Sequence, residues 1–136
     1  MTRNYKDNVI VKLTFQFALD VIDFAEILRE QKRFSFADQT LRAGCSVGAN
    51  VKEAQNAESK ADFIHKLKIA AKEAEETEYW LELCEFAKNY PKPGKLLKDV
   101  ESILKVLAKI ISTSRKNGNS FIIFSTLIID SLIIEN

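Results

Sequence analysis

Four stretches of the chain carry apolar residues spaced three and four positions apart, and this spacing constrains the fold more than any other feature. Residues at that spacing share one face of an α-helix, so each stretch predicts an amphipathic helix that buries one side. The clearest pattern lies in residues 96–111. The opposite face of that stretch and its continuation carry Lys98, Lys105, Lys109 and Lys116. The chain therefore predicts an all-α protein.

The ends of the expected helices are marked by capping and breaking residues. Ser35-Phe36-Ala37-Asp38 and Ser59-Lys60-Ala61-Asp62 both have the Ser-x-x-acid form of a capping box, which satisfies free amides at a helix start. Pro91-Lys92-Pro93-Gly94 predicts a loop, and Asn117-Gly118 a stop. The expected helices cover about residues 5–31, 35–56, 60–88 and 96–117.

Short connections between four helices favour an antiparallel up-down-up-down four-helix bundle. We expect the bundle to occupy residues 1–117 and an extra hydrophobic segment to occupy residues 118–136. Within the second helix, Gly44 and Gly48 lie one turn apart, where another helix backbone could approach closely. Each glycine costs a helix about 1 kcal/mol relative to alanine, so a packing benefit is the expected compensation.

A row of polar residues follows one face of the expected second helix: Gln39, Arg42, Ser46, Asn50 and Glu53. A solvated face is one interpretation, but such faces are usually rich in Lys and Glu, and this row has short side chains in its middle. The alternative is a row whose groups bond to another helix or subunit, since buried polar groups need partners. The third helix offers a matching set: Lys72, Glu73, Glu76, Tyr79 and Trp80. We expect Arg42 to pair with Glu73 or Glu76 in a buried network.

Charge is segregated along the chain although the whole chain has a net charge of only +1. Residues 73–87 contain six acids and no base, whereas residues 88–117 contain eight bases and two acids, a net charge of +6. A solvated helix face explains this in a monomer. In an oligomer the basic surface is multiplied and could bind RNA or DNA through phosphates. The candidate binding residues are Lys98, Lys105, Lys109, Arg115 and Lys116.

A second hypothesis is a protein-interaction scaffold with no nucleic-acid role, which docks a partner on its acidic third helix or its apolar tail. An enzyme is the least supported reading. The chain has one histidine, His65, which we expect at the surface, so two Glu-x-x-His metal motifs cannot be assembled. A single histidine on a polar helix start is also a poor candidate for the base of Cys45 or Cys84. We predict no catalytic residue, no metal and no cofactor.

Two cysteines are too few for a disulfide framework, and the first residues lack the apolar core of a signal peptide, so we expect a cytoplasmic protein. The tail contains an apolar stretch of 14 residues interrupted by Asp130. A membrane span needs about 20 residues, so we expect no membrane contact. The tail could instead be a helix or strand that packs on the bundle or a neighbouring chain; a membrane anchor and a segment outside the evolved domain are the alternatives.

Four blocks of the sequence resemble one protein family: QTLR at 39–42, SVGANVKEA at 46–54, SKADF at 59–63 and AKEAEETEYWL at 71–81. This pattern is similar to that of the 23S rRNA intervening-sequence proteins over about residues 5–117. The resemblance implies a bacterial, non-enzymatic four-helix bundle that assembles as a homopentamer. It also implies a possible association with nucleic acid and with a reverse transcriptase, as in similar accessory proteins of retroelements. The apolar residues after Asn117 depart from the family pattern.

Overall fold

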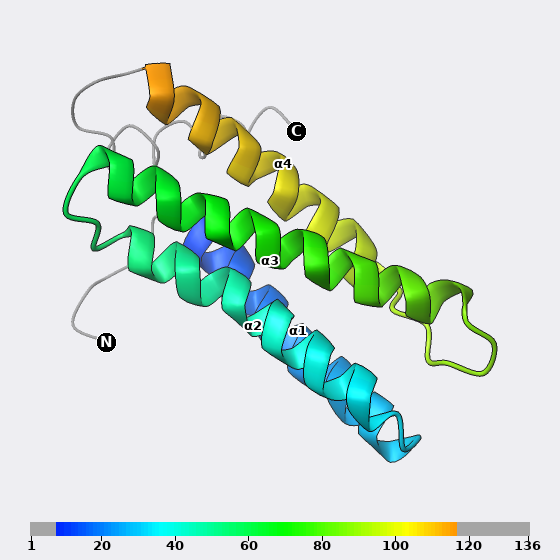
Figure 1. Ribbon diagram of the computed structural model, residues 1–136. Helices are drawn as coiled ribbons and strands as arrows, with labels where there is room; N and C mark the ends of the chain where they lie inside the picture. The colour runs from blue at the N-terminus through cyan, green and yellow to red at the C-terminus, as the bar shows by residue number, and fades with distance from the viewer. Residues whose placement is uncertain (1–7, 117–136) are drawn as a thin grey trace.

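The computed structural model describes residues 8–116, which form four α-helices joined by short connections (Figure 1). The helices are α1 (Val9–Glu30), α2 (Phe34–Ala54), α3 (Lys60–Phe86) and α4 (Lys95–Lys116). The four-helix bundle predicted from the apolar spacing is confirmed, and no strand occurs among the described residues. The expected tail at residues 118–136 lies outside this range.

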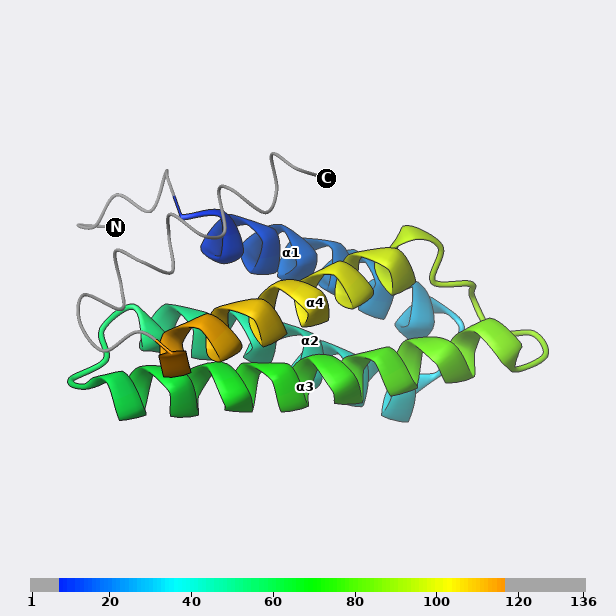
Figure 2. The ribbon, with the colours of Figure 1, turned by 90° about the horizontal axis from the view of Figure 1, so that it is seen from above.

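Successive helices run in opposite directions, and α4 returns to lie against α1 as well as α3 (Figures 1 and 2). The apolar faces meet along the axis of the bundle in one continuous core. Its largest fully buried side chains include Phe17, Leu28, Phe63, Leu67, Leu81, Leu107 and Ile110. Within residues 8–116 no helix is both long enough and apolar enough to cross a membrane.

The two glycines of α2 lie against α1, as their spacing predicts. A Cβ atom on Gly44 would stand 2.7 Å from Cγ1 of Val21, and one on Gly48 would stand 3.2 Å from the carbonyl oxygen of Thr14. Both distances are shorter than ordinary van der Waals contacts, so α1 and α2 approach more closely than side chains at these positions would permit. This close contact compensates for the low helix propensity of glycine.

The two predicted capping boxes have different outcomes. At α3 the prediction is confirmed, because the Ser59 hydroxyl accepts a hydrogen bond from the Asp62 amide at 3.0 Å. At α2 it is wrong, because the helix begins at Phe34, one residue before Ser35, and no side chain caps it. Asp38 instead forms an ion pair with Arg29 of α1.

Lysine side chains cap the ends of two helices. The ammonium group of Lys92 donates to the carbonyl oxygens of Cys84, Glu85 and Ala87 at 3.3, 2.8 and 3.0 Å. Lys60 donates to the carbonyl oxygen of Arg115 at 3.3 Å. The last carbonyls of a helix lack intrahelical donors, and a cation there also complements the helix dipole. Both lysines therefore have a structural role.

We predict that Gly44→Leu destabilises the protein although leucine favours helix formation. The added side chain must displace Val21, which is fully buried, so we expect a loss of about 2 kcal/mol from overpacking. Urea denaturation followed by circular dichroism measures the change. Ala49→Leu, at an exposed position of the same helix, is the control and should be neutral or slightly stabilising. Equal stability of the two variants would contradict the close contact between α1 and α2.

Candidate functional site

Four lysines of α4 form an exposed row that we call the lysine stripe: Lys98, Lys105, Lys109 and Lys116. They are separated by seven, four and seven residues, so at 100° per residue they lie within about 40° of one another around the helix. The stripe is about 27 Å long at 1.5 Å per residue. Residues on the other side of α4, including Leu107 and Ile110, are fully buried, which directs these lysines outward.

The stripe keeps most of its charge free of partners. Lys105 lies 3.4 Å from Glu101, but both side chains are well exposed, and such pairs contribute little. No ion pair among residues 8–116 holds Lys98, Lys109 or Lys116. The ammonium groups of the stripe are therefore available to an anionic ligand.

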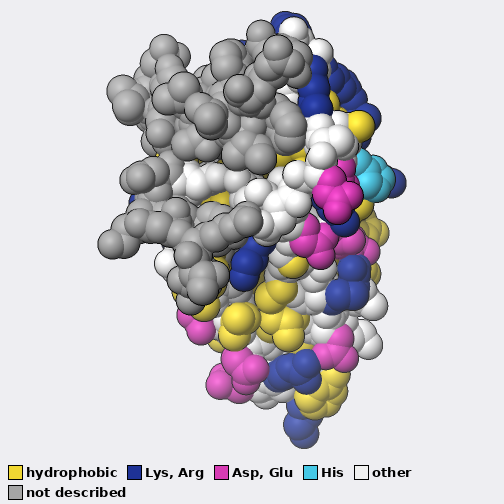
Figure 3. Space-filling model, turned by 90° about the vertical axis from the view of Figure 1, so that its left-hand side faces the viewer, with side chains coloured by type: hydrophobic (Ala, Val, Ile, Leu, Met, Phe, Trp, Pro, Cys, Tyr) yellow, Lys and Arg dark blue, Asp and Glu magenta, His cyan; other side chains and the backbone are white. Residues whose placement is uncertain are grey.

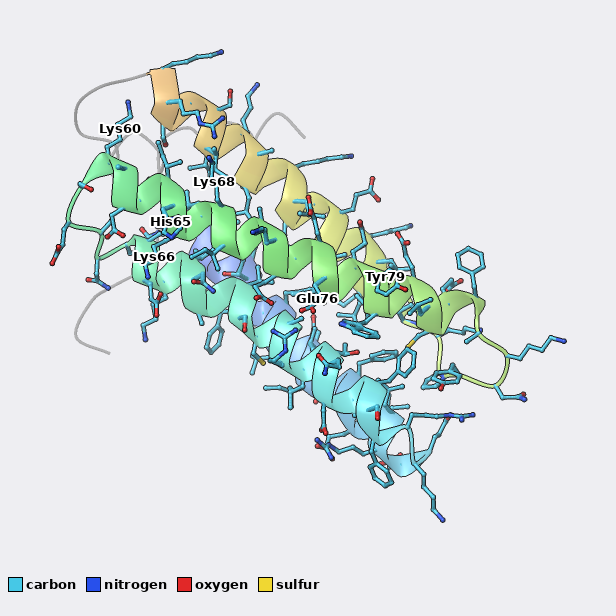
Figure 4. All side chains as sticks on the ribbon, viewed as in Figure 1. Lys60, His65, Lys66, Lys68, Glu76 and Tyr79 are labelled. Atoms are coloured by element: carbon cyan, nitrogen blue, oxygen red, sulfur yellow. The ribbon has the colours of Figure 1, made fainter. Side chains whose placement is uncertain are left out.

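The fifth predicted residue, Arg115, is exposed but lies about 100° around the helix from the stripe. It lines a groove between α3 and α4 together with Lys68. Lys60 and Lys68 lie on the first half of α3, beside the end of α4 (Figure 4). Lys and Arg side chains also gather at this end of the molecule, near the single histidine, on the face shown in Figure 3. The five predicted residues thus divide between two adjacent surfaces.

Arg42 of α2 bridges two glutamates of α3, as predicted. Its guanidinium lies 3.2 Å from Glu73 and forms a second ion pair with Glu76. The hydrogen bond to Glu76 is the main cause that raises the pKa of Arg42. The expectation of a buried network is wrong, because the Arg42 side chain is 48% exposed and that of Glu76 is 39% exposed. The cluster links α2 to α3 at the surface and contributes little stability.

The rest of the polar row finds partners within the chain. The Ser46 hydroxyl donates to the carbonyl oxygen of Arg42 at 2.7 Å, and the Asn50 amide donates to that of Ser46 at 2.8 Å. Glu53 pairs with Lys66 of α3 at 3.2 Å, and Gln39 is exposed. Serine and asparagine can bond to the carbonyl four residues earlier, which the sequence interpretation overlooked. The row therefore does not require a neighbouring subunit.

The aromatic residues expected to complement this row do not meet it. Tyr79 is 56% exposed and lines the groove between α3 and α4. Figure 4 shows Glu76 on the side of α3 nearer to α2. Trp80 packs edge-on against Phe36 of α2, with 5.5 Å between ring centroids. Lys72 is exposed on α3.

The groove between α3 and α4 is a feature that the sequence interpretation missed. It has a volume of about 710 Å³. Its apolar lining comes from Ala71 of α3 and from Leu104, Ala108 and Ile111 of α4. Its polar lining includes Glu75, Glu78 and Glu82, which we call the acidic wall. The signal in the sequence was the spacing of these three glutamates on one face of the third helix, combined with small residues on both helices.

One carboxyl group of the acidic wall, that of Glu78, has a raised pKa. Partial burial, followed by the negative charges of Glu82, Glu101 and Glu75, raises the pKa of Glu78. Both causes disfavour the ionised carboxylate. The carboxylates of the acidic wall therefore repel one another in the folded protein, and a cation bound in the groove would reduce this repulsion.

The thiols and the histidine show no catalytic arrangement. Burial raises the pKa of Cys84 to about 11 and also raises the pKa of Cys45, so both thiols stay protonated at neutral pH. His65 is exposed on α3, as predicted. Among the described residues no three His, Cys, Asp or Glu side chains form a group that could hold a metal ion.

The family model described as 23S rRNA-intervening sequence protein matches residues 6–112. The chain belongs to this family. The chain is also similar to a protein with unknown function from the S23 ribosomal protein family of Bacteroides thetaiotaomicron VPI-5482, whose crystal structure is known. The two share 41% sequence identity with a TM-score of 0.71, over 75% of this chain and 97% of that one. No curated protein matches the chain. The resemblance expected from the sequence is confirmed.

We predict that Glu78→Gln stabilises the protein at neutral pH. Because the pKa of Glu78 is raised in the folded state, the native protein holds this proton more tightly than the unfolded chain does. Its contribution to stability is therefore lost as pH rises through the raised pKa, and the substitution removes that loss. We expect a Tm higher by about 2 °C at pH 7 and little change at about pH 3, below the unfolded pKa of a glutamate. Thermal denaturation at both pH values measures this, and a Tm that rises equally at both would contradict the electrostatic cause.

Proposed function

We propose that this 23S rRNA-intervening sequence protein binds RNA or DNA through the lysine stripe of α4. The observation that supports this function best is the arrangement of four exposed lysines on one helix face, facing away from the core. A length of about 27 Å corresponds to about eight base pairs at 3.4 Å per step along a strand. The stripe can therefore follow a phosphate backbone.

Lysine ammonium groups contact phosphates without reading bases, so the proposed binding has little sequence preference. Each neutralised phosphate releases counterions, which makes the affinity fall with rising salt. The stripe also lacks exposed aromatic side chains between its lysines that could stack on unpaired bases. We therefore expect contact with the backbone to dominate.

We propose that the protein binds nucleic acid in the cytoplasm and does not act as an enzyme. This proposal is supported by the two protonated thiols, which are poor nucleophiles. It is also supported by the exposed position of the single histidine, which lies outside the lining of the groove.

We also propose that identical chains associate, with the pentamer as the form that the family resemblance implies. The support is an exposed apolar row on α1, made of Phe15, Leu19 and Ile22, whose side chains are 62%, 42% and 41% exposed. Their spacing of four and three residues places them on one face, about 40–60° apart. We propose this contact through α1 and not one through the polar row of α2, because the groups of that row are satisfied within the chain.

The alternative function is a protein scaffold without a nucleic-acid role. The two functions differ in the expected effect of removing lysines of α4 on nucleic-acid binding. The groove between α3 and α4, which is separate from the lysine stripe, is the observation that favours it. A reverse transcriptase is one partner that the family resemblance implies for either function. Substitution within the stripe distinguishes the two functions.

We predict that Lys105→Gln/Lys109→Gln weakens nucleic-acid binding and reduces its salt dependence. Each lost phosphate contact should lower the slope of log K against log salt by about 0.9, so two lower it by about 1.8 on duplex. Fluorescence anisotropy with duplex and single-stranded RNA of about 20 nucleotides, between about 50 and 200 mM salt, measures the slope. Lys12→Gln/Lys52→Gln, two exposed lysines on α1 and α2, is the matched control and should retain the slope. An affinity that does not change with salt concentration would contradict the proposal. Unchanged nucleic-acid binding by the Lys105→Gln/Lys109→Gln variant would favour the scaffold.

We predict that Leu19→Glu/Ile22→Glu converts an oligomer into a folded monomer. Two charges in the apolar row would make its burial against another chain unfavourable, whereas both positions are already exposed in the single chain. Sedimentation equilibrium at micromolar protein concentration measures the mass, and circular dichroism checks the fold. Ala49→Glu on the exposed face of α2 serves as the control. A wild-type protein that sediments as a monomer would contradict self-association.

A further inference from the structure

The groove between α3 and α4 is separate from the lysine stripe that we propose for nucleic-acid binding. Its base is apolar, because Leu104, Ala108 and Ile111 of α4 face Ala71 of α3 across it. Ala71 and Ala108, one on each helix, are the smallest side chains of the lining. Small residues on both walls allow the backbone of another element to come close.

Negative and positive side chains lie at opposite ends of the groove. The acidic wall on α3 presents Glu75, Glu78 and Glu82, which are separated by three and four residues and therefore share one face over about 10 Å. The opposite end of the groove has two cations, Lys68 of α3 and Arg115 of α4. An occupant of the groove must therefore be basic at one end and tolerate positive charge at the other.

The acidic wall has no direct ion-pair partner among the described residues. None of its three glutamates forms an ion pair among residues 8–116. Partial burial, together with the nearby negative charges of Glu82, Glu101 and Glu75, raises the pKa of Glu78. An arrangement that disfavours the folded chain alone becomes favourable when a cationic partner binds.

We propose that this groove binds a basic amphipathic helix of a partner protein, with its apolar face against Leu104, Ala108 and Ile111 and with Lys or Arg side chains opposite the acidic wall. The basic residues of the partner are spaced at i, i+3 or i+4 and i+7, which matches the spacing of Glu75, Glu78 and Glu82. The proposal is independent of the nucleic-acid function, because none of the lysines of the stripe lines the groove.

The charge polarity of the groove also fixes the direction of the bound helix. The C-terminus of a helix carries partial negative charge, which is stabilised near Lys68 and Arg115, and its N-terminus carries partial positive charge, which is stabilised near the acidic wall. Since α4 ends at the Arg115 end of the groove, the partner helix runs parallel to α4. It therefore runs antiparallel to α3.

Other occupants fit the charges less well. Nucleic acid would place phosphates against three carboxylates. Residues 118–136 of this chain contain Asp130 and Glu135 and no lysine or arginine, so they lack the cations that the wall requires. The exposed apolar row of α1 in a second copy is flanked by Asp23 and Glu26, which would be repelled. A partner with a basic helix is the occupant that satisfies both ends of the groove.

The test uses the full-length chain and a fluorescein-labelled 18-residue helical peptide with leucine and alanine on one face and arginine at i, i+4 and i+7. Two peptides serve as probes of specificity: one has the same composition in scrambled order, and the other has glutamate in place of arginine. We expect saturable binding of the designed peptide and at least about tenfold weaker binding of both others in anisotropy titrations. Equal binding of the scrambled peptide would overturn the proposal, and tighter binding of the acidic peptide would assign the groove to an anionic segment instead.

Variants locate the binding on the protein. Glu78→Gln/Glu82→Gln should weaken binding about tenfold, whereas Glu58→Gln/Glu85→Gln, with the same change in net charge outside the groove lining, should not. Ala108→Trp fills the base of the groove at an exposed position and should abolish binding while helicity by circular dichroism is unchanged. Equal affinities of the two glutamine pairs, or retained binding by Ala108→Trp, would contradict the site.

The direction of the peptide is checked with a photoreactive group at its C-terminus. We expect crosslinks at the Ser112–Arg115 end of the groove, and crosslinks at Glu82 would show the reverse orientation and contradict the dipole argument. Anisotropy with duplex RNA under the same conditions separates the two proposals. The acidic-wall variants should retain RNA binding, and the Lys105→Gln/Lys109→Gln variant should retain peptide binding.

Discussion

The burial of the apolar face of α4 determines where every charged residue of this helix lies. Leu107 and Ile110 are fully buried, and an α-helix that buries one side must expose the residues on the other. The lysines at positions 98, 105, 109 and 116 therefore form one stripe as a consequence of packing, with no specific contact required to align them. The same rotation places Leu104, Ala108 and Arg115 on a flank of α4, where they line the groove with α3. Two candidate binding surfaces thus follow from one packed interface.

The two surfaces differ in how much the fold itself explains them. A stripe of exposed lysines is what a soluble amphipathic helix produces by default, and its interest lies in its length and its freedom from ion pairs. The acidic wall is less easily explained by folding, because partial burial, together with the negative charges of Glu82, Glu101 and Glu75, raises the pKa of Glu78. Surface positions on a helix tolerate many residues, so an arrangement that disfavours the folded chain points to a role outside folding. This difference makes the groove more informative about function than the stripe.

The sequence was sufficient where the structure depends on periodicity or on a local bond. Apolar spacing predicted the four helices, the Gly44 and Gly48 pair predicted a close helix contact, and Ser59 predicted a cap. The capping box at Ser35 failed because α2 begins one residue earlier, at Phe34, which places Ser35 inside the helix. The pairing of Arg42 with Glu73 and Glu76 was predictable from chemistry, whereas its exposure was not. The groove depends on the register between α3 and α4, which no single-helix pattern specifies.

The net charge of residues 88–117 overstates the cationic surface available to a ligand. Lys92 donates to three carbonyl oxygens at the end of α3. Lys95 lies 3.2 Å from Asp20 and 3.5 Å from Asp99, and the hydrogen bond to Asp20 is the main cause that raises its pKa. The Asp20 side chain of α1 is only 21% exposed, and this ion pair with the start of α4 gives its charge a partner. A count of charges in a sequence mixes lysines that hold the fold together with lysines that are free to bind, and only the contacts separate the two groups. For this chain the separation leaves the stripe, together with Arg115 at the mouth of the groove, as the principal cationic surface of α4.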